Sequence, residues 1–178
     1  MEASYPYTLH VNEFSDTADI TIRPAFSEDA EGIARTFLES AEYHAQVDPE
    51  RYLAPAFEAI SAHYRQALRD VPQTDVNITF VATLGNEIVG FIEARLEQSP
   101  DAMHRETLYC HVAEMAVLHT YQNQGIGRQL LRAAEGWGRQ KGAVFASLEY
   151  HASNTPAAAF YRQLMGYRVA AITAIKRL

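Results

Sequence analysis

Apolar and polar positions alternate along five segments of this chain, and a period of two predicts strands with one buried face. The five segments cover residues 20–24, 78–84, 87–96, 108–118 and 144–150. Gly85 and Asn86 separate the second segment from the third, and a two-residue link of this kind predicts a tight hairpin turn.

Apolar residues recur at helical spacing between these strands. Ser27 is a predicted N-cap, because acidic residues follow it in what would be the first turn of a helix over 28–42. Asp48 followed by Pro49 is a second helix start, which Pro55 interrupts. A longer helix then has its apolar positions at Phe57, Ile60, Tyr64 and Leu68.

Two further helices are predicted in the second half of the chain. The first opens at Ile126 and ends at Gly142, with an apolar face that includes Trp137. Gly136 and Gly138 inside it cost about 1 kcal/mol each relative to alanine, and close packing against a sheet is one reason to keep them. The second begins at Asn154-Thr155-Pro156, where proline suits the first helical position.

Length and composition predict one globular domain with a substantial core, since 48% of the 178 residues are apolar and no segment is of low complexity. We expect the domain over 20–178 and an extension of undecided packing over 1–19. The net charge of −7 argues against binding to nucleic acid, whose phosphates select basic faces. An acidic surface favours cationic small molecules, or serves solubility alone.

Cysteine usage and the early residues indicate a compartment. Cys110 has no partner for an internal disulfide, and its apolar neighbours predict a packed thiol rather than a nucleophile. The first basic side chain is Arg23, so no charged start of a signal peptide is present, and no apolar run is long enough to span a bilayer. We expect a cytoplasmic, soluble protein that does not bind membranes.

A polar, glycine-rich turn, Gln122-Asn123-Gln124-Gly125-Ile126-Gly127, connects the strand over 108–118 to the next helix. The first N–H groups of a helix lack intrahelical partners and lie at its positive end, so they bind phosphate readily. A dinucleotide site would need a third glycine where Leu130 stands, and a P-loop would need a Gly-Lys-Ser/Thr sequence. Two interpretations of this segment remain, an ordinary turn and a phosphate-binding site.

The pattern Gln-x-x-Gly-x-Gly, five residues after Val117, resembles the acetyl-CoA motif of the GCN5-related N-acetyltransferase (GNAT) superfamily. Asn154, Phe160-Tyr161 and Gly166 are similar in spacing to a second motif of that family. The resemblance covers residues 20–178 and implies an α/β (α+β) fold. Its central sheet would be mixed and mostly antiparallel, flanked by helices and splayed at the CoA cleft between Leu118 and Val144.

The resemblance also implies acetyl-CoA as co-substrate and no metal. Its pantetheine arm would add as a strand along the backbone of Met115, Ala116 and Val117. Further cofactor-binding residues implied by the motifs are Gln122, Asn123, Gln124, Gly125, Ile126, Gly127, Arg128, Asn154 and Tyr161. Positions 122 and 124 are often basic in the family, so here the grip would rest more on backbone amides and Arg128.

Two side chains match the catalytic groups of the family. Alternation along 108–118 places Val112, Glu114 and Ala116 on one side of the strand. A carboxylate in an apolar strand needs a purpose or a partner. Glu114 stands where many members carry the base that deprotonates the amine, and the alternative is an ion pair with Arg95 or Arg105. Tyr161, seven residues after Asn154, matches the acid that protonates the departing thiolate; the alternative is a packed tyrosine.

The acceptor amine would bind near Glu114 and between the first two strands, as the resemblance implies. Candidates there are Tyr43, His44, Asp48, Tyr52 and Tyr64, each of which is otherwise a solvated or half-buried side chain. His119 and His151 flank the cleft or lie on the surface. No histidine has a helical i, i+4 partner or a cysteine partner, which predicts the absence of a metal site.

The function implied is an N-acetyltransferase that moves the acetyl group of acetyl-CoA to a primary amine of a small molecule or peptide, by direct attack in a ternary complex. The alternative is a non-catalytic module that binds or senses acyl-CoA. Residues 167–176 form a β-rich run without a turn. Either the final hairpin of the family is reduced, or this run pairs with a second subunit in a homodimer.

Overall fold

The computed structural model describes residues 20–70, 75–99 and 103–177, so the extension expected at 1–19 lies outside the described residues. Five strands form one sheet in the order β1 (Ile20–Pro24), β2 (Asn77–Leu84), β3 (Glu87–Gln98), β4 (Leu108–Val117) and β5 (Phe145–Leu148). The first four are antiparallel neighbours, and β5 runs parallel to β4. The predicted mixed, mostly antiparallel sheet is confirmed.

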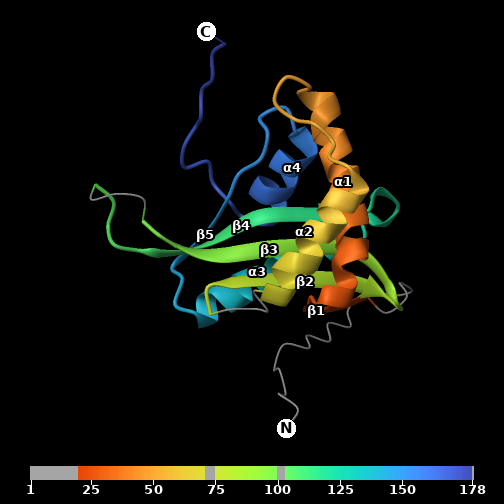
Figure 1. Cartoon of the computed structure of the whole chain (residues 1–178). Helices are drawn as coiled ribbons and strands as arrows, with labels where there is room; N and C mark the ends of the chain where they lie inside the picture. The colour runs from red at the N-terminus through yellow and green to blue at the C-terminus, as the bar shows by residue number, and fades with distance from the viewer. Residues whose placement is uncertain (1–19, 71–74, 100–102, 178) are drawn as a thin grey trace.

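Helices cover both faces of this sheet (Figure 1). On one face α1 (Ala30–Val47) and α2 (Phe57–Asp70) pack over a cluster that includes Ile33, Val81 and Phe91. On the other face α3 (Ile126–Gln140) packs over a larger cluster around Phe80 and Leu130. The chain then continues through α4 (Thr155–Ala159) into a π-helical turn, η3 (Phe160–Leu164). Among the described residues, none of the helices has the length and apolarity that crossing a bilayer requires.

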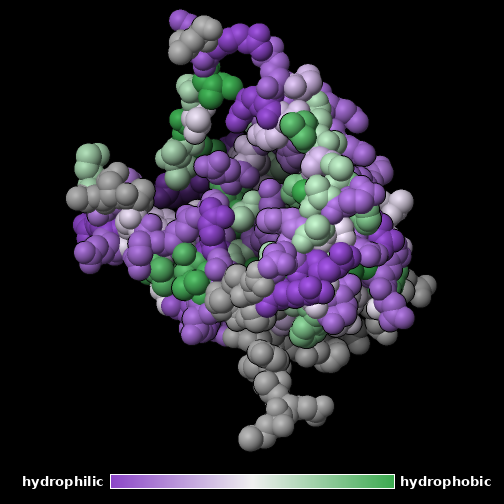
Figure 2. All heavy atoms as spheres, viewed as in Figure 1, coloured by the Kyte–Doolittle hydropathy of each residue, from purple (hydrophilic) through white to green (hydrophobic). Residues whose placement is uncertain are grey.

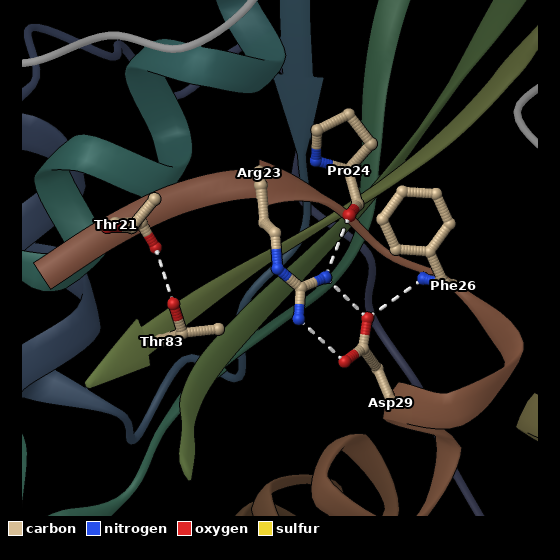
Figure 3. Close-up of polar contacts among 6 residues, drawn as sticks. All are labelled: Thr21, Arg23, Pro24, Phe26, Asp29 and Thr83. Atoms are coloured by element: carbon tan, nitrogen blue, oxygen red, sulfur yellow. Dashed lines mark hydrogen bonds and ion pairs between the residues drawn. The ribbon is translucent and has the colours of Figure 1, made fainter. Parts of the chain in front are cut away.

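An ion pair, rather than the predicted Ser27 cap, closes the connection from β1 to α1 (Figure 3). Ser27 to Asp29 form a 3-10 turn, η1, and the Asp29 carboxylate accepts two hydrogen bonds from the Arg23 guanidinium at 2.6 and 2.8 Å. It also accepts the N–H of Phe26 at 2.8 Å. Since Asp29 is buried, three donors compensate its lost hydration.

The helix predicted to start at Asp48-Pro49 does not form. The first helix runs further than expected, and Asp48 closes its last turn by donating its N–H to the carbonyl of His44 at 2.9 Å. Proline cannot donate the next helical hydrogen bond, and residues before proline avoid the helical region. The Asp-Pro pair therefore ends one helix instead of starting another.

A β-bulge changes the direction of the side chains along β4. Glu93 lies opposite Glu114, but the next residue on β3, Ala94, lies opposite Val112, so Ala113 is an extra residue. Val112 consequently packs with the α3 cluster, whereas Ala116 packs with the α1 and α2 cluster. The prediction that Val112 shares a side with Glu114 and Ala116 is wrong, because strict alternation does not hold across a bulge.

Close packing explains one of the two glycines inside α3. A Cβ added at Gly138 would lie 2.4 Å from Cys110 Cβ and 2.7 Å from Cys110 Sγ, whereas one added at Gly136 would meet nothing within 4 Å. The Cys110 thiol is buried, donates to the Ala134 carbonyl at 3.4 Å, and has its pKa raised to about 11 by burial. The predicted packed thiol is confirmed.

Beyond Gly166 the chain is extended, and no strand pairing is found over 167–177 within the described residues. Val169, Ile172 and Ile175 are exposed along it, and Figure 2 shows a run of hydrophobic and polar side chains that projects from the domain. Its far end contacts the domain again through an ion pair between Arg177 and Glu50 at 3.1 Å. The pairing of this run with a second subunit stays a prediction. The strand expected over 144–150 is shorter, with β5 ending at Leu148.

Candidate active site

The sheet opens between β4 and β5. Their parallel pairing joins Tyr109 to Phe145 and ends where Val112 meets Leu148. Beyond that point Met115, Ala116 and Val117 pair only with β3 on their other side. This confirms the predicted splay, and it leaves one backbone edge of β4 without a strand neighbour among the residues that the structure describes.

The N-terminus of α3 lies at the end of this opening and carries no side-chain cap. Gly125 has φ +81° and Asn123 has φ 61°, so the turn enters the left-handed region twice. The first bond of the helix joins Gln129 N–H to the Gly125 carbonyl at 3.1 Å, which leaves the N–H groups of the first turn free of helical partners. A Cβ at Gly127 would lie 3.6 Å from the Phe160 ring.

The two glutamines of the turn use their side chains within it. Gln122 Nε2 donates to the Val117 carbonyl at 3.1 Å, and Gln124 Nε2 donates to the Thr120 carbonyl at 3.2 Å. Arg128 lies in the first turn of α3 and is partly buried. The positive groups available to an anion here are thus backbone amides, the helix dipole and the Arg128 guanidinium.

Tyr161 lies within an aromatic cluster on the other side of the opening. Its ring stacks on Tyr150 at 5.6 Å and contacts Phe160 and Tyr167 edge-on. It belongs to the π-helical turn, a distortion that often occurs at functional sites. Burial first, and the charge of Glu114 second, raise the pKa of Tyr161 to about 12, so its phenol is protonated at neutral pH.

Asn154, the other residue of the second motif, caps α4. Its side-chain oxygen accepts the N–H of Ala157 at 3.1 Å, and its carbonyl accepts the N–H of Ala158. The predicted helix start is therefore confirmed at this residue. The amide NH₂ of Asn154 takes no part in this cap and can donate to a ligand.

Glu114 projects from β4 on the side that faces α1 and α2. It reaches solvent, yet the surrounding protein desolvates it enough to raise its pKa. Arg95, one of the alternative partners, instead pairs with Glu97 at 2.6 Å. The charge of Glu114 helps to raise the pKa of Tyr161, which packs with the α3 cluster, and that of Tyr64, which packs with the α1 and α2 cluster.

A second carboxylate, Glu93, belongs to this site and was missed in the sequence. It lies directly opposite Glu114 on β3. Burial first, and the charge of Glu114 second, raise the pKa of Glu93 to about 7, while Arg95 acts in the opposite direction. The signal was present, because Glu93 interrupts the apolar run of its strand as Glu114 does.

Glu93 also lines a pocket between α2 and the sheet. The pocket walls come from α2, β2, β3 and β4, and they include His63, Tyr64, Asn77, Thr79, Glu93, Arg95 and Ala113. Tyr64 is buried there, and burial together with the two carboxylates raises its pKa. Of the acceptor-site candidates, Tyr64 is the one that lies with Glu114.

The remaining candidates form a separate cluster. The rings of His44 and Tyr52 are 5.4 Å apart, and Tyr52 contacts the His151 ring edge-on. His151 Nε2 lies 3.3 Å from the Asp48 carboxylate, and Tyr43 packs edge-on against His44. This cluster joins the end of α1 to the loop after β5, so His151 is half-buried rather than on the surface.

His119 does not join either group. It is exposed, and its backbone N–H donates to the Glu39 carboxylate at 2.5 Å. Over residues 20–70, 75–99 and 103–177, no group of three or more histidine, cysteine, aspartate or glutamate side chains could hold a metal ion.

A splayed mixed sheet with an uncapped, glycine-initiated helix beside the splay is the arrangement of an acetyltransferase. The profile of the acetyltransferase (GNAT) family matches residues 31–167, which is most of the chain, and the protein therefore belongs to that family. One solved structure of this fold is a complex with CoA.

One relative is an N-alpha-acetyltransferase of Saccharolobus solfataricus, which is 34% identical over 93 residues. The alignment covers 48% of this chain and 53% of the relative, so the match spans about half the length of that protein.

Solved structures match more of the chain at lower identity. A mutant BH1408 protein from Bacillus halodurans aligns with a TM-score of 0.78 at 23% identity, covering 88% of this chain and 98% of that one. The aminoglycoside N-acetyltransferase AAC(6')-Iy in complex with CoA aligns at 0.67 and 19%, covering 93% and 99%. The aminoglycoside acetyltransferase meta-AAC0020, from an uncultured soil metagenomic sample and in complex with sisomicin, aligns at 0.65 and 20%, covering 89% and 95%.

Proposed function

We propose that this protein transfers the acetyl group of acetyl-CoA to a primary amine, which attacks the thioester directly in a ternary complex. The observation that carries the proposal is the free backbone edge of β4 beside the uncapped start of α3, with Glu114 on that strand and its charge acting on the Tyr161 phenol. An attacking amine needs a base and a departing thiolate needs an acid. The site offers one of each.

The donor would bind along the opening. Backbone groups of Met115 to Val117 on the free edge of β4 hold the pantetheine arm, and the amides of residues 123–128 hold the diphosphate. The free edge and the uncapped helix start fit such a ligand, since both present main-chain groups without partners in the sheet or helix. Arg128 adds one fixed positive charge.

The charges on the two catalytic side chains give an order to the proton transfers. A primary amine is about 0.04% free base at pH 7, so Glu114 first removes a proton from the ammonium form. Once Glu114 is neutral, its charge no longer raises the pKa of Tyr161, and the phenol becomes a better acid. Tyr161 then protonates the CoA sulfur as the C–S bond breaks, and the amine nitrogen returns a proton to the phenolate.

The acceptor would be a small molecule or a peptide with a cationic amine. Among the proteins similar to this chain, one is an N-alpha-acetyltransferase and two are aminoglycoside acetyltransferases. Both names are compatible with an amine acceptor, in a peptide or in a small molecule. The pocket beneath α2 is lined by Tyr64 and by Glu93, the register partner of Glu114, and it is where we place the amine.

The first experiment measures thiol release from acetyl-CoA with spermidine, sisomicin, free amino acids and a peptide with a free amino terminus. Release with any of them supports the transferase. Calorimetric binding of CoA without release would favour the non-catalytic module, and no binding of CoA would remove both hypotheses.

The acid is tested with Tyr161→Phe, which keeps the ring stacked on Tyr150 but removes the hydroxyl. We expect kcat at saturating acetyl-CoA to fall about 10²-fold or more, with the Kd of CoA little changed. The matched control is Tyr167→Phe, because Tyr167 is a neighbouring tyrosine whose hydroxyl donates to Glu135 instead. Equal turnover of the wild type and Tyr161→Phe would remove the assignment.

A further inference from the structure

Two carboxylates oppose each other in the middle of the sheet. Glu93 and Glu114 are register partners on β3 and β4, immediately before the bulge at Ala113. Side chains directly opposite in an antiparallel pair share a face, with Cβ atoms about 5 Å apart, and like charges there are destabilising. A stable sheet would avoid this pair, so its presence calls for a function.

The groups around the pair do not neutralise it. From α2, Tyr64 and His63 face the pocket, and from β3 Arg95 reaches its wall. Arg95 directs its Nε to Glu97, and no salt bridge to Glu93 or Glu114 occurs within residues 20–70, 75–99 and 103–177. Arg95 acts on Glu93 through its charge without forming a salt bridge, and a docked ammonium would add a second positive charge to the pocket.

We propose that Glu93 and Glu114 act as one proton-accepting pair for the cationic acceptor amine, with Glu93 as the carboxylate that keeps the proton. This rests on the proposed function and changes the role of Glu114, which becomes the partner that makes Glu93 basic. Glu93 lines the acceptor pocket directly, whereas Glu114 is its exposed register partner on β4.

Of the two protons that leave the ammonium nitrogen, this pair takes the first and the CoA sulfur takes the second. The docked ammonium gives one proton to Glu93, and the neutral nitrogen forms the N–C bond as the C–S bond breaks. The second proton leaves nitrogen and reaches sulfur through the Tyr161 hydroxyl. The neutral amide and the free thiol depart, and the proton on Glu93 is released to solvent. Because the pKa of Glu93 is raised to about 7, the pair loses its proton above neutral pH and is then able to accept one from the ammonium.

The pair also selects among amines. An acceptor with a carboxylate next to its amine would place a third negative charge against Glu93 and Glu114. Polyamines, aminoglycosides and peptide amino termini lack that group, whereas free amino acids carry it. The acceptor class is therefore a cationic amine without an adjacent carboxylate, and we expect kcat/KM for a free amino acid to be at least 10²-fold lower than for the best such amine.

The pairing is tested without activity by ¹³C NMR titration of side-chain carboxyls in protein labelled at glutamate. We expect one carboxyl to titrate near pH 7, to vanish in Glu93→Gln, and to move down by about one pH unit in Glu114→Gln. Glu106→Gln, in the exposed connection before β4, is the control and leaves it unchanged. If no carboxyl titrates above pH 5.5, or Glu114→Gln does not move it, the pair is refuted.

The catalytic role is tested by the pH dependence of kcat/KM with the panel amine that releases thiol fastest. The wild type should lose activity below pH 7, and Glu93→Gln should lose about 10²-fold or more at pH 7.5. Glu114→Gln should also lose activity, but the acidic limb of what remains should lie at lower pH than in the wild type. A Glu93→Gln profile identical to wild type refutes the inference and leaves the transferase intact. A wild type that releases no thiol with any amine removes the transferase, and this inference with it.

Discussion

Gly136 and Gly138 both lie in α3 but differ in their surroundings, so substitutions at the two positions test how this helix packs on the sheet. Gly138 faces β4 and Gly136 faces open space, so replacing each by alanine adds the same methyl group to two different environments. Both changes improve helix propensity by about 1 kcal/mol. Only the change at Gly138 forces two elements apart.

The magnitude follows from the contacts. At Gly138 the added Cβ would lie 2.4 Å from Cys110 Cβ, an atom fixed to the backbone of β4, and 3.6 Å from Ala143 Cβ. Overpacking of this kind costs about 1–3 kcal/mol. We expect Gly136→Ala to stabilise the protein by about 1 kcal/mol, and Gly138→Ala to be destabilised relative to it by about 1–3 kcal/mol.

Urea unfolding followed by far-ultraviolet circular dichroism measures both values. The difference between the two variants isolates the contact with β4, because the propensity gain is common to both. The m-values should match the wild type, which would show that the unfolded states are alike. If Gly138→Ala is as stable as Gly136→Ala, α3 does not press on Cys110 as described.

Two further predictions concern ionisation. The pKa of Glu93 is raised from 4.5 to about 7 in the folded state, so the folded protein holds this proton more tightly and its stability falls as pH rises from 4.5 to 7. Glu93→Gln should therefore be more stable than wild type by about 3 kcal/mol at pH 8 and about equal at pH 4, by urea unfolding; no gain at pH 8 would contradict the raised pKa. Cys110, with a pKa near 11, should react with iodoacetamide at least 10²-fold more slowly when folded than in urea at pH 8; equal rates would show an accessible thiol.

Much of the fold could be predicted because local signals agree with the final packing. The period of two located the strands, Gly85-Asn86 marked the hairpin between β2 and β3, and Gly142, at φ +90°, ended α3 where expected. Each signal depends on residues near one another in sequence. None needs a partner from a distant segment.

The predictions that the structure corrected share a cause: each feature depends on contacts with residues from distant segments of the chain. Ala113 fits plain alternation as well as any residue, and only its pairing with β3 shows it as a bulge. Asp48-Pro49 suits a helix start or a helix end, and the extent of α1 decides which. Glu93 could have been noticed by the argument used for Glu114, since both interrupt an apolar strand. Their position opposite each other depends on the register of the two strands, which the sequence does not specify.

The acceptor candidates show the same limit. Tyr43, His44 and Tyr64 all precede β2 in the chain, yet Tyr64 lies beside the carboxylates while the other two lie with Tyr52 and His151. Which group a helical tyrosine joins depends on how α1 and α2 turn toward the sheet. That orientation is set by packing rather than by the spacing of residues.

The hydrogen bond from Gln122 to Val117 has an energetic consequence. The carbonyl at the tip of β4 is already satisfied by an amide of the protein, so a ligand that donates to it exchanges one bond for another and gains little, since net hydrogen-bond contributions are about 1 kcal/mol at most sites. The free energy that retains a long flexible ligand must then come mainly from its anionic end. Removing the Gln122 side-chain amide would leave the Val117 carbonyl free to accept a hydrogen bond from a ligand, with no new contact elsewhere.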